Sequence, residues 1–277
     1  MLTPTFYKVA IGDGMEISMK ILLNGIGGFM GREVVKLCEA GYRGAELAIG
    51  VDPNYNGGES CKVYTSHSDI PEDIDVDVIV DFSHHSATES LLRFATERGI
   101  PTVLATTGHT EDELSFISNA AQTIPVFFSA NMSLGVALLV ELAKTAALAM
   151  PEAEIEIIEK HHDRKIDAPS GTALMIANAI IDTKPGAYVN LGRSGHGKRT
   201  PMEIGIHAIR MGNIVGEHEV IVGTQNQTIT LKHEAHSRAL FAEGALAAAD
   251  FLKGKPRGLY DMKSLISGKG SDDLFED

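Results

Sequence analysis

The residues best suited to acid–base chemistry stand close together, at His161, His162 and Lys165. Histidine exchanges protons near neutral pH, and lysine adds positive charge and further protons. Residues 160–200 carry seven Lys and Arg against three Asp and Glu, in a chain whose net charge is −13. This local basic excess indicates an anion site. The alternative is a pair of surface histidines at the end of a strand, followed by a solvated lysine.

A Pro-Ser-Gly-Thr turn follows the basic cluster and opens a predicted helix. The backbone N–H groups of Gly171 and Thr172 would be free at the helix N-terminus, where anions are stabilised. The hydroxyls of Ser170 and Thr172 would face the same way. We therefore expect a carboxylate to bind at this turn, beside the histidines.

A glycine turn at residues 25–31 separates a predicted strand from a predicted helix. Glycines there allow a tight turn and let a pyrophosphate approach the backbone at the helix N-terminus. Asp52 ends the next predicted strand, 21 residues after Gly31, where an acid accepts hydrogen bonds from ribose hydroxyls. The combination predicts a dinucleotide site, whereas a glycine cluster alone would fit an ordinary structural turn.

The elements that must position these residues fall into two groups. In the first half, apolar strands alternate with helices, which predicts a parallel sheet covered on both faces. The predicted strands are 20–24, 46–51, 77–82, 101–106 and 125–128, and the predicted helices are 32–39, 87–98 and 112–122. The loops at 81–83 and 105–108 follow strands of this sheet, at the edge where ligands bind.

After residue 131 the pattern changes. A long apolar helix at 134–150 precedes strands whose apolar residues alternate with polar ones, which predicts an antiparallel sheet with one covered face. These strands are 153–160, 203–210, 216–222 and 228–233. Between them we expect a helix within 167–181 and a long, basic, glycine-rich loop at 183–201. A last helix is predicted at 239–252.

Composition narrows the class of protein. The apolar and charged fractions of 44% and 22% are those of a globular chain, and the net charge of −13 argues against nucleic acid and anionic membranes as partners. No apolar run is long enough to span a membrane, and residues 1–18 lack the pattern of a secretory signal. With Cys38 and Cys61 as reduced thiols, we expect a cytoplasmic protein.

A metal site is not expected, although the chain has 11 histidines. Two pairs are adjacent in sequence, at His84–His85 and His161–His162, and adjacent side chains point in different directions. No H-x-x-x-H or C-x-x-C spacing occurs.

On these features the sequence resembles the 4-hydroxy-tetrahydrodipicolinate reductases, also called dihydrodipicolinate reductases, of lysine and diaminopimelate synthesis. The resemblance runs from Met19 to about Ile266. It is carried by the motifs GIGGFMGRE, VDFS, ATTGHT, SANMSLGV, EIIEKHHDRKIDAPSGTAL and GEHEV.

The resemblance implies an α/β fold in which a parallel-sheet dinucleotide domain, residues 19–131 with 239–277, surrounds an inserted α+β domain at 132–238. Residues 1–18 would be an N-terminal extension. The inserted domain would bind the substrate and join four subunits into a homotetramer through the open faces of its sheets. This assembly agrees with the alternating strands, which leave one face without a partner.

Residue roles follow by motif from the same resemblance. His161 would be the general acid/base and Lys165 its catalytic partner. The carboxylates of a small dicarboxylate substrate would be held by His162, Ser170, Gly171, Thr172 and Arg238. The cofactor would contact Gly25, Ile26, Gly27, Gly28, Phe29, Met30, Asp52, Ala105, Thr106, Thr107, Ser129, Ala130, Asn131 and Met132.

The implied reaction is the NADH- or NADPH-dependent reduction, at ring C4 after loss of water, of 4-hydroxy-tetrahydrodipicolinate to tetrahydrodipicolinate. Phe29 and Pro53 stand where many relatives have arginine, and Ala105 replaces a usual glycine. Asp52 would repel a 2′-phosphate, so we expect NADH to be preferred over NADPH. Two other functions stay open: reduction of another imino or keto acid, and nicotinamide sensing without chemistry.

Overall fold

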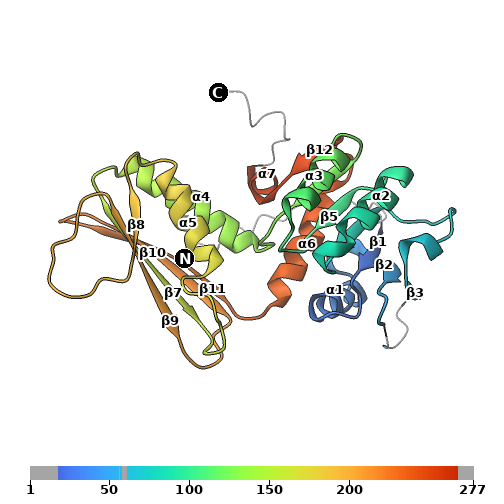
Figure 1. Cartoon of the computed structure of the whole chain (residues 1–277), viewed down its shortest axis with the longest axis horizontal. Coiled ribbons are helices and arrows are strands. Elements are labelled where there is room, and N and C mark those ends of the chain that lie inside the picture. Colours follow the sequence, from blue (N-terminus) through green and yellow to red (C-terminus); the bar gives the residue numbers. More distant parts are fainter. Residues whose placement is uncertain (1–17, 56, 58–60, 268–277) are drawn as a thin grey trace, which may run out of the picture.

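The computed structural model describes residues 18–55, 57 and 61–267, which form two β-sheets with helices packed on them (Figure 1). Of the predicted extension, residues 1–17 lie outside the described part, and the Ser18 hydroxyl donates a hydrogen bond to Glu46 at 2.6 Å. No helix in the described part of the chain is long and apolar enough to cross a membrane.

The first sheet has seven strands in the order β12-β6-β5-β4-β1-β2-β3, and all its neighbours run parallel, as predicted. Its strands are β1 (Met19–Asn24), β2 (Ala45–Val51), β3 (Lys62–Tyr64), β4 (Val78–Asp81), β5 (Thr102–Leu104), β6 (Pro125–Phe128) and β12 (Gly258–Tyr260). The sequence did not predict β3 and β12, because a strand of three residues is too short to show a hydrophobic period.

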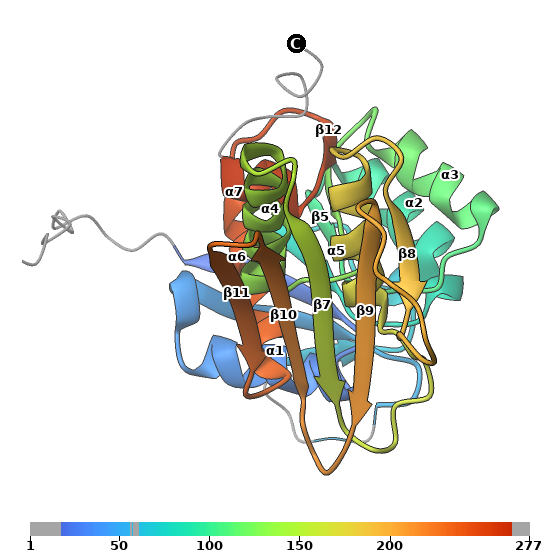
Figure 2. The same ribbon diagram turned by 90° about the vertical axis from the view of Figure 1, so that its left-hand side faces the viewer.

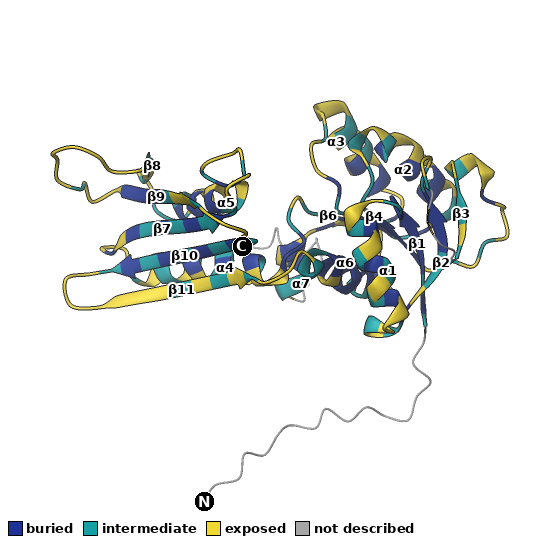
Figure 3. Cartoon of the chain, turned by 90° about the horizontal axis from the view of Figure 1, so that it is seen from below, coloured by how far each residue is buried: buried dark blue, intermediate teal, exposed yellow. Residues whose placement is uncertain are grey.

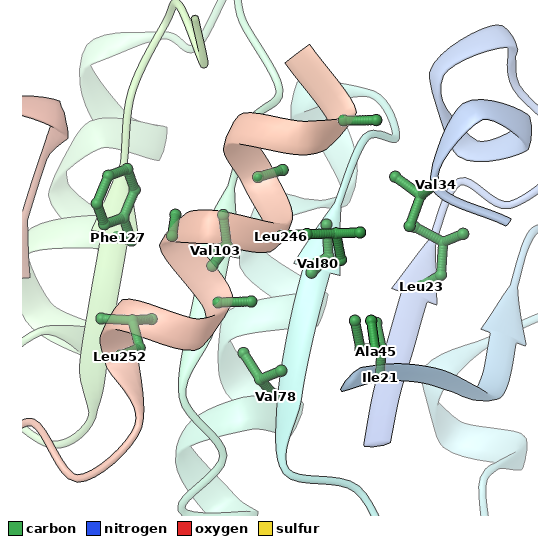
Figure 4. Close-up of a cluster of buried hydrophobic side chains, with 14 of the residues drawn as sticks. Ile21, Leu23, Val34, Ala45, Val78, Val80, Val103, Phe127, Leu246 and Leu252 are labelled. Atoms are coloured by element: carbon green, nitrogen blue, oxygen red, sulfur yellow. The ribbon is translucent and has the colours of Figure 1, made fainter. Parts of the chain in front are cut away.

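Helices cover both faces of this sheet because alternate strand residues point to opposite sides. Ile21 and Leu23 of β1 pack in the core formed with α1 and α6, whereas Leu22 packs in the core formed with α2 and α3 (Figure 4 draws part of the first core). The helices are α1 (Phe29–Glu39), α2 (Thr88–Arg98), α3 (Glu111–Ala120), α6 (Ala239–Leu252) and α7 (Met262–Ser267), with single 3₁₀ turns at Tyr42–Gly44, His67–Asp69 and His85–Ala87. The last helix of the chain thus returns to the first sheet.

The second sheet has five strands in the order β11-β10-β7-β9-β8. They are β7 (Glu154–His161), β8 (Tyr188–Leu191), β9 (Glu203–Arg210), β10 (Gly216–Gly223) and β11 (Thr228–Ala235). The sheet is mixed. β10 runs antiparallel to β7 and β11, as predicted, but β9 runs parallel to both β7 and β8, and there the prediction was wrong. Alternation records which face of a strand is buried, but it carries no information on strand direction. The predicted loop at 183–201 likewise contains the edge strand β8.

One face of the second sheet is covered by α4 (Leu134–Ala149) and α5 (Gly171–Ile181), as Figure 2 shows with the sheet in front. Along β10 buried residues alternate with half-buried ones, which is the predicted two-sided pattern. No helix or strand in the described part of the chain covers the other face, and β11 at its edge is largely exposed (Figure 3). The α5 helix begins at Gly171 rather than near 167, so residues 162–170 form a loop between β7 and the helix.

Candidate active site

The glycine turn lies between β1 and α1, as predicted. Gly25 has a φ of +84°, and a Cβ at this position would lie 2.6 Å from the Phe82 carbonyl oxygen. A Cβ at Gly31 would lie 2.2 Å from the Gly25 carbonyl oxygen. Only glycine fits at either position, so the turn passes close to the loop after β4. The N–H groups of Gly25, Gly27 and Gly28 are bonded within the protein, whereas those at the start of α1 have no partner inside the helix.

Asp52 lies directly against this turn. Its Oδ2 accepts a hydrogen bond from the Gly27 backbone N–H at 3.0 Å, and its Oδ1 accepts one from Asn54 N–H at 2.9 Å. The carboxylate is therefore held at the end of β2, where it can accept further hydrogen bonds from a ribose.

A pocket of about 420 Å³ opens over the turn. It is lined by residues from the ends of β1, β2 and β4 and by the start of α2, among them Gly25, Gly28, Asp52, Pro53, Ser83 and His84. The other predicted cofactor residues of the turn differ in position: Ile26 is buried in the core, Met30 packs against that core, and Phe29 is exposed. The turn thus offers backbone groups and the Asp52 carboxylate to the pocket.

Asp81 lies at the end of β4 and begins the 81–83 loop that the sequence predicted at the ligand edge, and it holds the surrounding loops together. Its buried carboxylate accepts hydrogen bonds from Asn24 Nδ2 at 2.8 Å, Ser83 Oγ at 2.6 Å and Thr106 Oγ1 at 2.7 Å. These partners lie at the end of β1 and directly after β4 and β5, so one carboxylate links three strand ends at the carboxyl edge of the sheet. Its position at the end of an apolar strand was the available signal.

The predicted loop at 129–132 connects the two halves of the site. The Ser129 hydroxyl donates to the Asn131 carbonyl at 2.8 Å, and Asn131 Nδ2 donates to the Thr172 hydroxyl at 3.1 Å. Met132 is buried beside them in the core of the first sheet. A predicted cofactor residue and a predicted substrate residue are therefore in direct contact.

His161 lies at the end of β7, and its Nδ1–H donates a hydrogen bond of 2.6 Å to Glu159. Glu159 is completely buried. Its carboxylate also accepts two hydrogen bonds of 2.7 Å from the Arg210 guanidinium and one of 2.9 Å from Ser170 N–H. Sequence reading missed Glu159 and Arg210 because their pairing joins β7 to β9. The buried carboxylate holds His161 in one tautomer, with Nε2 available for proton transfer.

The pKa values in this group follow from burial and charge. Burial would raise the pKa of Glu159, but the hydrogen bonds from Arg210 and His161 hold that pKa below its ordinary value. Burial lowers the pKa of His161, and the Glu159 carboxylate opposes that shift without reversing it. The Lys165 and Arg210 charges lower the pKa of His161 further.

Lys165 lies in the loop after β7, where its Nζ forms an ion pair of 2.8 Å with Asp167. The Lys165 ammonium lowers the pKa of the Asp167 carboxyl. His162 is partly exposed, and its Nδ1 has no hydrogen-bond partner in the described part of the chain. Lys165 is thus anchored by Asp167, close enough to His161 for its charge to lower the pKa of that ring.

The turn at the start of α5 contains two kinds of residue. The Ser170 hydroxyl is the N-cap: it accepts from Ala173 N–H at 3.2 Å and lies 3.0 Å from His218 Nε2. Ser170 is therefore engaged within the protein. The N–H groups of Gly171 and Thr172 belong to the first turn and have no partner inside the helix. They are the groups that an anion can reach.

Arg238 lies where the chain enters α6 and returns to the first sheet. Its guanidinium carbon is 5.7 Å from the centre of the exposed Phe29 ring, at the glycine turn. No hydrogen bond or ion pair joins Arg238 to the basic cluster within residues 18–55, 57 and 61–267. The structure thus brings together the other predicted substrate residues but places Arg238 on the cofactor side.

No three His, Cys, Asp or Glu side chains among the described residues are grouped so that they could hold a metal ion.

Residues 19–132 match the family model described as "Dihydrodipicolinate reductase, N-terminus", and residues 135–266 match "Dihydrodipicolinate reductase, C-terminus". The chain belongs to the dihydrodipicolinate reductase family. It is accordingly an oxidoreductase that depends on a nicotinamide dinucleotide, and the glycine turn with Asp52 fits that cofactor.

Relatives within the family cover nearly the whole chain. The 4-hydroxy-tetrahydrodipicolinate reductase of Clostridium tetani is 42% identical over 254 residues, which are 91% of this chain and 98% of the relative. That of Caldanaerobacter subterraneus is 45% identical over 250 residues, 90% of this chain and 98% of the relative. The fold is shared with the dipicolinate-bound dihydrodipicolinate reductase from Paenisporosarcina sp. TG-14, with a TM-score of 0.75 and 23% identity over 88% of this chain and 98% of that one.

Proposed function

We propose that this chain catalyses the reaction for which its relatives are named. The reaction would take place between the glycine turn and the basic cluster. That reaction is the reduction of 4-hydroxy-tetrahydrodipicolinate to tetrahydrodipicolinate, a step of lysine and diaminopimelate synthesis. When bound, the nicotinamide supplies the hydride. Loss of the hydroxyl group as water and addition of hydride together consume one proton in each turnover, so the protein must provide an acid.

His161 is the proposed general acid and base, and the observation that carries this assignment is its hydrogen bond to the buried Glu159. The bond leaves Nε2 as the nitrogen that exchanges a proton with the substrate. Lys165 assists through its positive charge, which stabilises negative charge as it develops on the ring.

One substrate carboxylate would be bound by the basic cluster and the α5 N-terminus, through His162, Ser170, Gly171 and Thr172. The free N–H groups of Gly171 and Thr172 and the partly exposed His162 support this assignment, while Ser170 contributes by capping the helix. We assign the second carboxylate to Arg238. Since this guanidinium lies beside Phe29, its role requires the two halves of the molecule to close around the substrate.

The proposed halves are a dinucleotide domain of residues 19–131 with 239–277 and an inserted substrate domain of residues 132–238. The contact between Asn131 and Thr172 lies at their junction. Closure about this junction would bring the hydride donor and the ring together.

We propose NADH as the preferred coenzyme, with NADPH as a weaker one. The argument is the Asp52 carboxylate, which would accept bonds from a free 2′-hydroxyl and repel a 2′-phosphate. Phe29 and Pro53 offer no compensating cation. The remaining proposed cofactor contacts come from the loops at 105–107 and 129–132.

The proposed assembly is a homotetramer in the cytoplasm. The uncovered face of the second sheet carries Ile158, Ile209 and Ile221 among charged residues, at positions that alternate with the buried face. A second copy of this face would remove those side chains from water.

Alanine variants of the two proposed catalytic residues test the assignment. A positioned acid or base contributes about 10²–10⁴-fold, so His161→Ala and Lys165→Ala should each lower kcat by about that factor. KM for NADH should change little, while Thr172→Ala should mainly raise KM for the substrate. His196→Ala and Lys253→Ala, which remove the same groups from exposed positions, serve as controls. The assignment is wrong if both single variants keep kcat within about threefold while remaining folded and able to bind NADH.

A further inference from the structure

A pocket of about 60 Å³ lies behind the proposed acid, separate from the dinucleotide pocket. His161, Gly216 and His218 line it from the second sheet, and Ser133 and Thr172 line it from the starts of α4 and α5. A water molecule occupies about 30 Å³ in the liquid, so the pocket accommodates water.

His218 is the polar residue that the mechanism above leaves unused. It pairs directly with Glu159 across β7 and β10, so the two side chains share the face that α5 covers. Its ring centre is 5.2 Å from that of His161, at an interplanar angle of 72°. His218 is only 4% exposed, and no group in the described part of the chain partners its Nδ1.

The hydrogen bonds around Ser170 assign the proton of His218. The Ser170 hydroxyl oxygen accepts from Ala173 N–H, so its own hydrogen needs an acceptor. His218 Nε2 lies 3.0 Å away and takes that role. The proton of the neutral ring is then on Nδ1, which makes Nδ1–H a buried donor. Burial lowers the pKa of His218 to about 4, so the ring is neutral at physiological pH.

His161 lines the same pocket. Its Nδ1 is bonded to Glu159, and its Nε2 lies beside Gly216, where a Cβ would be only 3.1 Å away. The absence of a side chain at residue 216 therefore keeps Nε2 open toward the pocket. A water that accepts a hydrogen bond from His218 Nδ1–H keeps both of its hydrogens free to donate, one of them to His161 Nε2.

We propose that this pocket holds ordered water, anchored by His218, through which His161 is reprotonated in each turnover. The inference rests on the proposed role of His161 as the acid. In the step itself an O–H bond of the anchored water breaks as the N–H bond at Nε2 forms, and solvent restores the lost proton to the water. His218 does not touch the substrate; it is a positioning residue for the water.

Two substitutions separate this role from support of the Ser170 cap. In His218→Asn the amide lies near the position of Nδ1 and keeps a donor for the water, but it cannot reach Ser170. In His218→Gln the amide lies near the position of Nε2 and keeps the Ser170 contact, but the donor toward the pocket is lost. The two variants are therefore matched controls for each other.

The measurement is kcat in H₂O and in D₂O, with folding checked by circular dichroism. We expect His218→Asn to stay within about threefold of wild type, and His218→Gln to lose about tenfold or more, since proton delivery contributes on this scale. The solvent isotope effect should rise in His218→Gln as reprotonation becomes slower. Equal kcat values, or a larger loss in His218→Asn, would overturn the proposal.

Two further results keep the test decisive. The activity of His161→Ala shows which of the two proposals fails. If His161→Ala retains full activity, the assignment of His161 as the acid is wrong. If His161→Ala is inactive while His218→Gln has normal activity, only the water relay is rejected. Should either His218 variant not fold, kcat of the unaltered protein is measured across H₂O–D₂O mixtures. A curved dependence, from more than one proton in transfer, supports the relay, whereas a linear dependence or the absence of any solvent effect contradicts it.

Discussion

Replacing Glu159 with glutamine removes one negative charge and leaves the shape of the side chain almost unchanged. Glu159 accepts hydrogen bonds from His161, Arg210 and Ser170, and it is completely buried. Glutamine can still accept from one or two of these donors, but its own N–H groups face the others. His161 therefore loses its charged partner and the constraint on its tautomer.

The expected size follows from the lost bond. A hydrogen bond to a charged group contributes about 1.5–3 kcal/mol, and about 1.4 kcal/mol corresponds to a factor of ten in rate, so kcat should fall by about 10- to 150-fold. The pH profile should change as well. Glu159 raises the pKa of His161, so in Glu159→Gln burial and the positive charges of Lys165 and Arg210 lower that pKa further. An acid works only while protonated, and the alkaline limb of the kcat/KM profile should therefore move to lower pH.

Glu156→Gln is the matched control. Glu156 lies on the same strand and also bonds an arginine and a histidine, Arg199 at 3.1 Å and His207 at 3.0 Å, but on the uncovered face. Steady-state kinetics from pH 5 to 10 on both variants, with the NADH dissociation constant as a check of folding, give the comparison. If Glu159→Gln keeps both kcat and its alkaline limb while Glu156→Gln does the same, Glu159 has no part in the proton transfer.

Three other results can be anticipated. The kcat/KM should be higher with NADH than with NADPH. Asp52→Asn should narrow the difference in kcat/KM by removing the charge that repels a 2′-phosphate. A clear preference for NADPH in the unaltered protein would contradict this and point to Arg32 or Lys62 as a phosphate partner. Light scattering at micromolar concentration should return four times the 29.7 kDa subunit mass, and a mass near one subunit would contradict the tetramer. Deleting residues 1–18 should leave activity and mass unchanged, because Ser18 contributes only one exposed hydrogen bond; loss of either would show that the segment is needed.

Much of the fold was predictable because its signals are local. The glycine turn, the Asp52 strand end and the alternating strands and helices of the first sheet each depend on residues close in sequence, and the parallel sheet was confirmed. In the same way the basic cluster and the Pro-Ser-Gly-Thr turn are contiguous. Residues in β7, its following loop and the start of α5 were therefore placed near one another from the sequence.

The direction and order of the strands in the second sheet were decided only by the tertiary structure. The alternating pattern is the same for a parallel and an antiparallel neighbour, so β9 beside β7 was not predictable from it. That neighbour supplies Arg210 to Glu159, and β10 on the other side supplies His218. The contact of Arg238 with Phe29 was likewise not predictable from the motif that contains Arg238.

The sequence by itself determined which residue types could carry out the chemistry, because side-chain pKa, charge and backbone freedom belong to single residues and short segments. The tertiary structure decided which of them are charged, oriented and supplied with protons. A buried carboxylate such as Glu159 is stable only when several donors meet it, and one of these, Arg210, comes from a strand 51 residues farther along the chain. Satisfying buried polar groups is a property of the packed core, and no local pattern records it.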